Sequence, residues 1–486
     1  MKSITNKISI IAAAVILLTA CTKKIDLKPE FQLDGSSPLT TIKEADNVLT
    51  GAYDGFQSGD YYRSNGPSGA FSVVPDIQGD DLIETFESLG NYRTKAEWKY
   101  ATNDPDVSTT WLSAYNIISS VNIILRDIDA IAVKEPKAAS RIKGQALAIR
   151  AHVHFDLLRL FGESLDGNST AKGIPYVTKF DVTAKPGRNT VKESYDLVLA
   201  DLDQAATILS GELDKPINTE TDKTHIDYLV VKAMQARVNL YAGKWQAAAD
   251  AASAVITERP LSTIDDFPLI WDDETNEEVL WSVSFNTVQD GVPYDNVFFV
   301  RGNRAAYRPA QGLTALYNQV NDVRYNTYFA VIGNLNDIPK TPRLVVVKHF
   351  GKDGSADGVV NWKVYRTAEM YLIRAEANYK LSKEAPALQD LNTLRANRIQ
   401  GFTPGTETGV LLYNAITTER RKELAFEGHR FFDFKRWGKL PINRCASNTN
   451  TPSTVCSLAS DSRSWAWPIP FNETIANTNI RQSEGY

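Results

Sequence analysis

Helical periodicity is the feature that most constrains the fold of this 486-residue chain. From residue 106 onward, apolar residues recur every three or four positions, which is the spacing that places them on one face of an α-helix. The segments with this spacing are 106–125, 138–161, 195–209, 229–241, 245–257, 367–381 and 384–397. Strand patterns occur at 279–285, 344–350 and 359–365, the last two on either side of a Gly- and Asp-rich turn. The sequence therefore predicts a mostly α-helical protein with a minor β component.

The helix pair at 229–260 has features of a tetratricopeptide repeat. It carries a small residue, a turn glycine, an aromatic residue, an alanine and a terminal proline at the matching positions: Ala236, Gly243, Trp245, Ala248 and Pro260. Residues 374–379 are similar to residues 233–241. We therefore predict degenerate helical repeats, which build a scaffold and perform no chemistry themselves.

Residues 1–20 have the form of a bacterial lipoprotein signal peptide. Two lysines precede an apolar run at 8–18, which is shorter than the about 20 residues that span a membrane. The run ends in Leu-Thr-Ala before Cys21, an order similar to a lipobox, in which this cysteine becomes the lipidated first residue of the mature protein. The alternative is an ordinary signal peptide with an incidental cysteine. Residues 21–38 are polar and contain prolines, so we expect a lipidated tether.

The charge of the chain argues against one class of partner. The formal net charge is −5, and removal of Lys2 and Lys7 with the signal peptide makes it −7. A mildly acidic protein is poorly suited to bind nucleic acid, whose phosphates attract basic surfaces.

Two cysteines remain after Cys21. Cys445 and Cys456 have ten residues between them, in a segment rich in Ser, Thr and Asn. An oxidising compartment would let them close a loop by a disulfide bond. Two unpaired thiols are the alternative.

The segment 416–439 combines charges and aromatic residues at unusual density. Eleven ionisable residues lie between Glu419 and Arg436, interleaved with aromatic and aliphatic side chains. We predict a helix buried on one side, with ion pairs at its margin, that runs into an aromatic anchor. Glutamates recur on one face at i, i+4 spacing: Glu419, Glu423 and Glu427. We expect Arg420 and Arg430 to neutralise them and the segment to be architectural, because buried charges specify geometry more than they add stability.

Catalytic and metal motifs are weak. His152 and His154 fall within a helical period, so their side chains diverge by about 200° and cannot bind one ion. Carboxylates are paired at 80–81 and 272–274, and a glycosidase would need two carboxyls about 5–9.5 Å apart. Calcium binding at 103–106 lacks the spacing of an EF-hand. We predict no metal and no cofactor, since the common motifs for them are missing.

The segments 54–100 and 265–308 are irregular and rich in Gly, Asp, Asn and aromatic residues. Long irregular segments in a helical protein are usually functional or disordered, and these are too aromatic for simple disorder. A sugar site needs exposed aromatic platforms flanked by polar groups. The candidate ligand-binding residues are Asp76, Asp80, Tyr92, Arg93, Tyr294, Phe298, Phe299, Arg301 and Tyr307. The alternative for each aromatic residue is a place in the core.

Several motifs resemble the SusD/RagB family of outer-membrane lipoproteins from Bacteroidetes. Besides the lipobox, they are the helix Gly144–Gly162, the segment Arg366–Ala377, the block Glu419–Gly438, and the closing Trp467–Pro470 and Gly485-Tyr486. The resemblance implies a SusD-like α-helical scaffold with tetratricopeptide-like helix pairs and irregular insertions carrying a few short strands. It divides the chain into an N-terminal SusD-like region at 39–220, a helix pair at 221–264, a ligand-face insertion with short strands at 265–365, and a C-terminal region at 366–486.

The resemblance also implies a function. Such proteins are binding proteins and not enzymes; they capture an oligosaccharide or other nutrient and deliver it to a SusC-type TonB-dependent transporter. The resemblance further implies a lipid-anchored protein of the outer membrane that faces the cell exterior. One departure is Thr22-Lys-Lys-Ile-Asp26, where surface-displayed relatives often carry acidic residues, so the exterior location rests on the family alone. The alternatives are a peptide or other non-glycan ligand, a surface glycoside hydrolase, and a helical scaffold that binds no small ligand.

Overall fold

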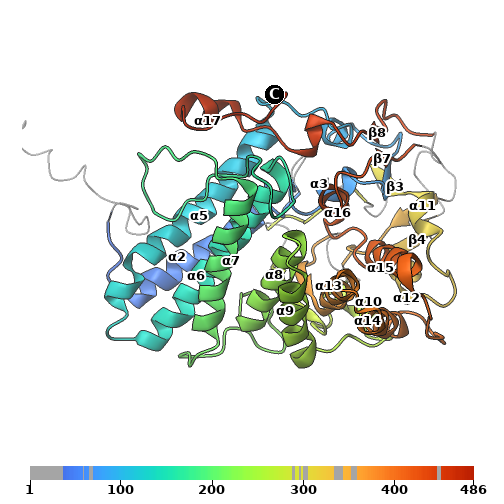
Figure 1. Ribbon diagram of the computed structural model, residues 1–486, viewed down its shortest axis with the longest axis horizontal. Helices are drawn as coiled ribbons and strands as arrows, with labels where there is room; N and C mark the ends of the chain where they lie inside the picture. Colours follow the sequence, from blue (N-terminus) through green and yellow to red (C-terminus); the bar gives the residue numbers. More distant parts are fainter. Residues whose placement is uncertain are drawn as a thin grey trace, which may run out of the picture. The chain divides into compact units, whose positions relative to one another are not determined.

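Long N-terminal helices pack side by side in the folded unit of residues 40–486 (Figure 1). They are α2 (Ile42–Asp54), α5 (Pro105–Ile131), α6 (Pro136–Phe161) and α7 (Val191–Leu209). Helix α6 packs against both α5 and α7 and is buried along most of its length. Helix α7 begins at a capping box, in which Thr190 and Glu193 each bond to the other's backbone N–H. The helices expected at 138–161 and 195–209 are confirmed, with starts a few residues earlier.

The computed structural model describes residues 37–58, 60–64, 69–286, 290–294, 297–298, 305–332, 343–351, 358–445 and 450–486. The predicted signal peptide, the lipidated Cys21 and most of the tether lie outside the described residues. Among the described residues, no helix combines the length and apolar character needed to cross a membrane.

Two helix pairs form a repeated unit. They are α8 (Tyr228–Tyr241) with α9 (Trp245–Glu258), and α13 (Thr367–Lys380) with α14 (Glu384–Ala396). Each pair turns through a residue in the left-handed region, Gly243 at φ 71° and Ser382 at φ 61°. The amide of the lysine that follows donates to the carbonyl of Asn239 in one turn (2.9 Å) and of Asn378 in the other (2.8 Å). The predicted repeat therefore exists, with the same turn in both copies.

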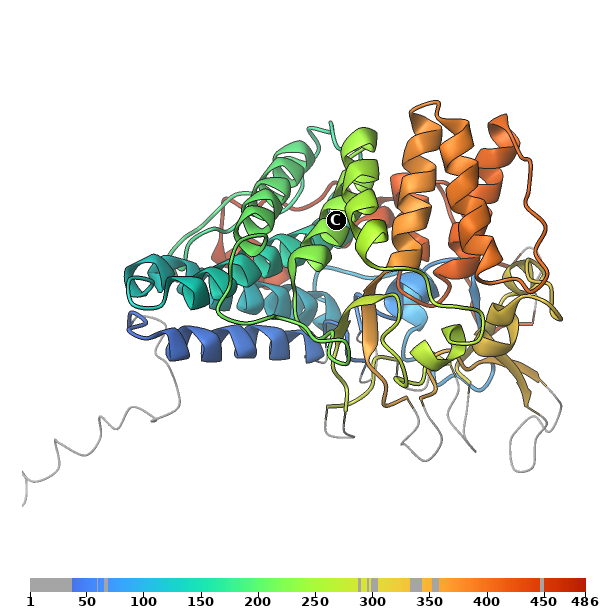
Figure 2. The same ribbon diagram turned by 90° about the horizontal axis from the view of Figure 1, so that it is seen from below.

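The repeated pairs stack against each other although an insertion separates them in the sequence. Helix α9 packs directly on α13, and the described residues of the segment between them leave the helical array and return to it at β6 (Figure 2). The scaffold is thus continuous in space across α8, α9, α13 and α14, while the insertion lies to one side of it.

Short two-stranded antiparallel sheets accompany the helices. The pairs are β1 (Leu82–Glu84) with β3 (Tyr307–Pro309), β2 (Val279–Val283) with β6 (Trp362–Arg366), β4 (Phe329–Ile332) with β5 (Arg343–Val346), and β7 (Ile442–Asn443) with β8 (Ser457–Leu458). The strands at 344–350 and 359–365 flank a Gly- and Asp-rich turn in the sequence, but they do not pair with each other. The first pairs with β4, while β6 is fully buried, pairs with β2 and contacts α8. Burial against the scaffold therefore overrides proximity along the chain.

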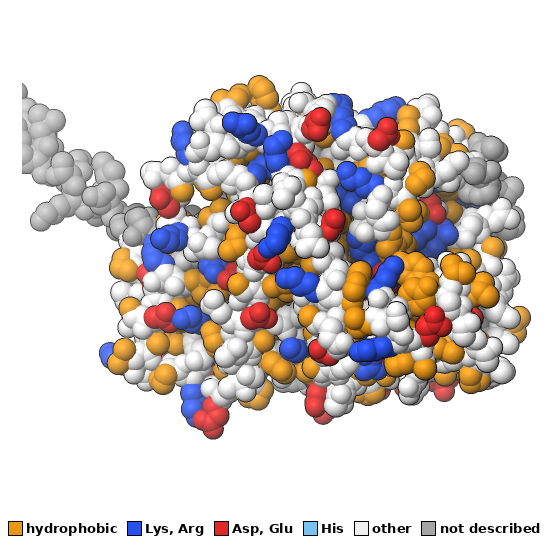
Figure 3. Space-filling view, in the orientation of Figure 1, with side chains coloured by type: hydrophobic (Ala, Val, Ile, Leu, Met, Phe, Trp, Pro, Cys, Tyr) orange, Lys and Arg blue, Asp and Glu red, His pale blue; other side chains and the backbone are white. Residues whose placement is uncertain are grey.

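Short helices and turns complete the described part of the fold. They are η1 (Gly55–Gln57), α3 (Val74–Ile77), α4 (Arg93–Ala96), α10 (Phe267–Ile270), α11 (Gln311–Thr314), α12 (Val323–Tyr328), η3 (Arg463–Trp465) and α17 (Phe471–Ala476). On the face shown in Figure 3, charged side chains of both signs are interspersed. That face therefore lacks the continuous basic stripe that binds a nucleic-acid backbone.

The segment 416–439 is not one helix, contrary to the prediction. Helix α15 (Gly409–Glu423) ends at Glu423, and α16 (Arg430–Arg436) begins seven residues later. Phe426 at φ 65° and Gly428 at φ 74° break the helix between them. A Cβ atom on Gly428 would lie 2.8 Å from the carbonyl oxygen of Phe71. The chain turns here because its backbone must approach the N-terminal segment closely.

We predict that Gly428→Ala lowers the free energy of unfolding by about 2–4 kcal/mol, since it combines a strained φ with a collision against backbone atoms. Gly438→Ala is the matched control: its φ is 92°, and an added Cβ would meet no atom within 4 Å. We expect this control to lose only the roughly 1 kcal/mol of the strained φ. Chemical denaturation of both variants measures the difference, and equal losses would contradict the steric role of Gly428.

Candidate ligand-binding site

A buried network of charges underlies the candidate site. Glu423, at the end of α15, accepts hydrogen bonds from Arg324 (3.0 Å), Arg366 (3.1 Å) and Arg398 (3.1 Å). Arg366 also bonds to Glu427 at 2.6 Å, and both Arg366 and Arg398 reach Glu278. These side chains are buried. The network therefore joins the C-terminal block to the insertion through the centre of the protein.

The network is balanced in charge. Its acids are Glu278, Asp322, Glu407, Glu419, Glu423 and Glu427, and its bases are Arg324, Lys348, Arg366, Arg395, Arg398 and Lys422. Burial by itself raises the pKa of Glu423, but the attraction of the surrounding arginines outweighs it and leaves this pKa well below its usual range. The same balance holds at Glu419. Burial raises its pKa, but the attraction of Arg324, Lys422 and Arg395 outweighs burial and lowers the pKa from 4.5 to about 2.

The prediction that Arg420 and Arg430 neutralise the three glutamates is wrong. Arg420 bonds to Asp433 at 2.8 Å, and Arg430 bonds to Asp80 at 2.6 Å. The ion pairs also lie in the core and not at the margin of a half-buried helix. The arginines that neutralise the glutamates come from distant parts of the chain, and helical spacing cannot reveal such partners.

A cavity of about 660 Å³ opens above this network, between α10, α12 and the chain that follows β5. Four buried residues line it: Trp271, Asp322, Lys348 and Gly351. Its exposed lining residues are Glu274, Val320, Asn321, Asn326 and Gln400. Apolar or partly apolar wall is added by Ile264, Pro268, Val323, Val347 and Phe350. Its volume falls within the range of small-ligand sites, about 300–1,000 Å³.

The cavity and the charge network share two residues. Asp322 accepts from Arg324 at 2.8 Å and pairs with Lys422 at 2.8 Å. Lys348 donates to Glu427 (2.7 Å), and its ammonium lies 4.1 Å from the ring centre of Trp271. The network therefore holds the inner surface of the cavity in place.

Two of the predicted ligand residues, Arg93 and Tyr307, lie beside Glu84. Arg93 donates to this carboxylate at 3.0 Å, and Tyr307 lies opposite Glu84 across the β1–β3 pair. The hydroxyl of Tyr92 bonds to that of Ser64. Tyr92 is 4% and Tyr307 is 0% exposed, so neither is the exposed platform that the sequence suggested.

Two further predicted aromatics pack around His349. Tyr294 donates to the carbonyl of His349, and the ring of Phe298 stacks on the imidazole with 6.2 Å between centres. Both aromatics are buried, which again contradicts the expected exposure. Phe299 and Arg301 lie outside the described residues.

The two predicted aspartates have structural partners. Asp76 is buried and accepts the N–H of Gly428 at 2.7 Å, which explains the close approach at that glycine. Burial raises the pKa of Asp76 well above its usual range. Asp80 is half-buried and pairs with Arg430 and Arg421. Ligand contact by Asp80 and Arg93 stays a prediction.

The residues that line the cavity were not predicted from the sequence as ligand-binding residues. The signal that could have indicated them is the density of amides and acids at 318–326, followed by aromatics, and the acidic run after Trp271. Their convergence depends on packing between α10 and α12, which are separated by more than fifty residues.

Each of the two carboxylate groups has a member that is engaged with a cation. Asp273 bonds to Lys363 at 2.6 Å, and Asp81 bonds to Arg421 at 2.7 Å. Within the described part of the chain, no group of three or more His, Cys, Asp or Glu side chains could hold a metal ion.

The two histidines of α6 point in different directions, as helical geometry predicts. The Nε2 of His152 contacts the hydroxyl of Tyr62 at 2.9 Å. His154 accepts the N–H of Val177 through Nε2 (3.0 Å), so its Nδ1–H donates to the carbonyl of Arg150. Burial lowers the pKa of His152 to about 4 and that of His154 to about 3. Both are neutral, structural residues.

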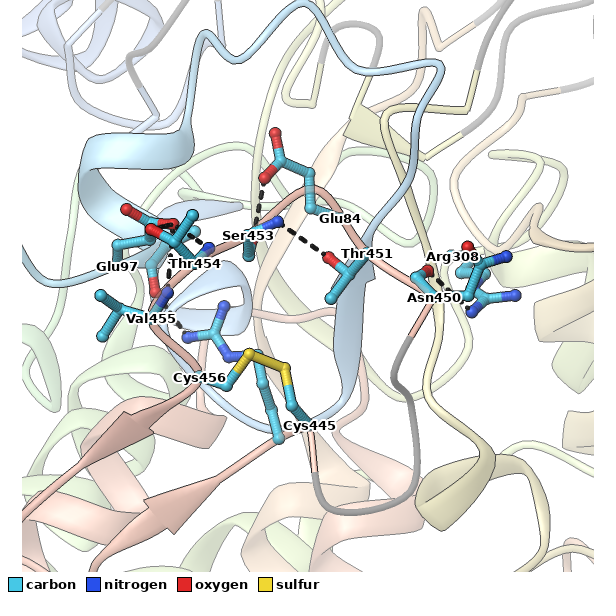
Figure 4. The surroundings of a disulfide bond; sticks show 12 residues. Glu84, Glu97, Arg308, Cys445, Asn450, Thr451, Ser453, Thr454, Val455 and Cys456 are labelled. Carbon is cyan, nitrogen blue, oxygen red and sulfur yellow. Dashed lines mark hydrogen bonds between the residues drawn. A yellow bond between two sulfur atoms is a disulfide. The ribbon is translucent and has the colours of Figure 1, made fainter.

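Cys445 and Cys456 form a disulfide (Figure 4). The loop that it closes is held by two glutamates of the N-terminal segment. Ser453 donates to Glu84 at 2.8 Å, and Thr454 donates to Glu97 through both its amide and its hydroxyl. The disulfide loop therefore braces the region around β1.

We predict that Glu419→Gln lowers the free energy of unfolding by about 3 kcal/mol at pH 6, because it leaves buried cations without their partner. The pH dependence should change as well. Between pH 5 and 2 the unfolded chain binds a proton at residue 419 that the folded protein does not, so wild-type stability falls on acidification.

The variant should lose less stability than wild type over that pH range, and chemical denaturation at several pH values measures this. Glu258→Gln, at an exposed position at the end of α9, is the control and should follow wild type. An unchanged acid slope in Glu419→Gln would contradict the assignment.

Comparison with known proteins agrees with this architecture. Residues 36–240 match a family model described as starch-binding and associating with the outer membrane, and residues 295–486 match the model of the SusD family. The SusD-like protein P38 of Formosa agariphila is 22% identical, over 97% of this chain and 96% of its own.

Solved structures are similar over nearly the whole chain. A SusD superfamily protein from Bacteroides thetaiotaomicron has a TM-score of 0.79 and 27% identity, covering 91% of this chain and 99% of its own. Another from Bacteroides vulgatus has a TM-score of 0.77 and 25% identity, covering 92% and 100%. The helical scaffold, the two matched segments and these likenesses together show that the chain belongs to the SusD family.

Proposed function

We propose that this protein captures an oligosaccharide at the cell surface and delivers it to a SusC-type TonB-dependent transporter of the outer membrane. The observation that carries the proposal is the cavity of about 660 Å³ beside the helical scaffold. Its walls combine apolar surface with amide side chains, and sugars present apolar C–H faces ringed by hydroxyl groups. The family model described as starch-binding supports a carbohydrate ligand.

The proposed location follows from the N-terminus and the family. Lipidation at Cys21 would anchor the chain, and the described residues contain no helix suited to span a membrane. The matched family model is described as associating with the outer membrane. We propose that the protein faces the exterior and that its stacked helix pairs offer the surface that lies against the transporter.

A binding role fits the described acids better than hydrolysis. A glycosidase needs one carboxyl that stays protonated in an apolar site and a second on the other side of the sugar. Asp81 and Asp273 are engaged with cations, and Glu274 is exposed at the rim of the cavity. Asp76, a buried acid, lies against the backbone of Gly428 and is not among the residues that line the cavity.

We predict that Cys21→Ser moves the protein from the membrane fraction to the soluble fraction, because the lipid attachment site is lost. Affinity purification of tagged wild type from outer membranes should recover a TonB-dependent transporter as its main partner. Cys445→Ser is the matched control, since it removes a cysteine but not the anchor, and it should stay in the membrane fraction. Membrane retention of Cys21→Ser, or purification without a transporter, would contradict the proposed anchor or partner respectively.

We also predict that the mature protein binds members of an oligosaccharide array and leaves them intact. Mass spectrometry of the oligosaccharides after prolonged incubation should detect no shorter products. Of the described acids that line the cavity, Asp322 is held in ion pairs and Glu274 is exposed, so neither is the buried, protonated acid that hydrolysis needs. An array of peptides of similar size tests the alternative ligand class. Selective peptide binding would contradict the proposed ligand, and shortened oligosaccharides would contradict the binding role.

A further inference from the structure

The charges around the cavity indicate which oligosaccharides it can hold. This inference rests on the proposed function, since it takes the ligand to be a sugar. We propose that the cavity between α10 and α12 binds an uncharged oligosaccharide segment and discriminates against sugars that carry carboxylate or sulfate groups. Three independent features of its wall lead to this conclusion: its cation, its acids and its amides.

The cation that lines the described part of the cavity is not available to a ligand. Lys348 is 1% exposed and donates to both Glu427 (2.7 Å) and the carbonyl of Ala425 (2.8 Å). Its ammonium also lies against the rings of Trp271 and Tyr328, 4.1 and 3.9 Å from their centres. An anionic sugar would therefore find no accessible cation among the described lining residues, and a charge-assisted hydrogen bond from a cation is the strongest contact that a protein side chain offers to carboxylate or sulfate.

The acids that line the cavity are Asp272, Glu274 and Asp322, and they act in the same direction, because a carboxylate does not attract an anionic sugar. Asp322 is neutralised within the network by Arg324 and Lys422. Glu274 is different, because it is exposed at the rim and forms no ion pair with a described residue. A negative group on the ligand would be repelled by this carboxylate, and like-charge contacts are a common means of rejecting a wrong ligand.

Uncharged amides supply the hydrogen bonds that a neutral sugar needs. Asn321, Asn326 and Gln400 line the cavity, and their side-chain amides bond to no other described residue. Each amide offers two donors and one acceptor oxygen, which suits hydroxyl groups that both donate and accept. The apolar wall beside them, which includes Pro268 and Val347, can cover the C–H faces of the ring.

The test uses pairs of oligosaccharides that differ only in charge: neutral oligosaccharides and the same compounds oxidised at C6 to carboxylates. Isothermal titration of the mature protein measures both members of each pair. For a pair whose neutral member binds, we expect the carboxylated member to bind at least about tenfold more weakly. One close like charge near a protein surface produces an effect of this size. Glu274→Gln should narrow this gap at least about threefold, and Glu258→Gln should leave it unchanged.

A second variant checks that binding occurs in this cavity. Asn326→Trp places a bulky ring in the cavity from an exposed position, and we expect it to weaken binding of the neutral sugar more than tenfold. Asn116→Trp, at an exposed position on α5, is its control and should bind as wild type does.

The outcomes separate the two proposals. Suppose that the carboxylated sugar binds as tightly as the neutral one or more tightly, and that Asn326→Trp abolishes this binding. This result would overturn the charge discrimination and leave the proposed function standing. Neutral binding that survives in Asn326→Trp would overturn the assignment to this cavity, again without affecting sugar capture. Binding of no oligosaccharide of either charge would overturn the proposed function itself, and this inference with it.

Discussion

The buried charges around Glu423 are the constraint on which the rest of the structure depends. Glu423, Arg366 and Arg398 belong to segments that are far apart in the sequence, and all three are buried. Removing such charges from water is costly, and only a complete set of partners offsets that cost. The network therefore tolerates one arrangement of the insertion against the C-terminal helices, in which each acid meets its base.

The candidate ligand site depends on this arrangement. Asp322 and Lys348 belong to the network on one side and line the cavity on the other. The C-terminal block, which the sequence suggested was architectural, therefore supports the candidate ligand site through these contacts. A displaced network would move Trp271 and the amides around it, so stability and binding are expected to be coupled at this site.

Much of the helical scaffold could be predicted because its signals are local. Helix α6 follows its apolar period, and the turns at Gly243 and Ser382 follow the repeat. The failures are at places where distant contacts decide. Helix α15 stops at Glu423 because the chain must turn to bring Gly428 close to Phe71, and β6 pairs with β2 because the scaffold buries it there. Neither contact leaves a periodic trace in the sequence.

The sequence by itself determined the helical class, the repeated pairs and the family resemblance, and it predicts a lipidation site at Cys21, since each of these depends on motifs whose residues are close together in the chain. Tertiary structure alone decided which polar and aromatic residues remain accessible. Tyr294 and Tyr307 are of the residue type that stacks on sugars, but other parts of the chain bury them. Asn326 and Gln400, in contrast, both line a cavity. The exposure of a residue depends on the side chains that pack against it. These side chains come from distant segments, which are brought together by the burial of apolar groups and of paired charges.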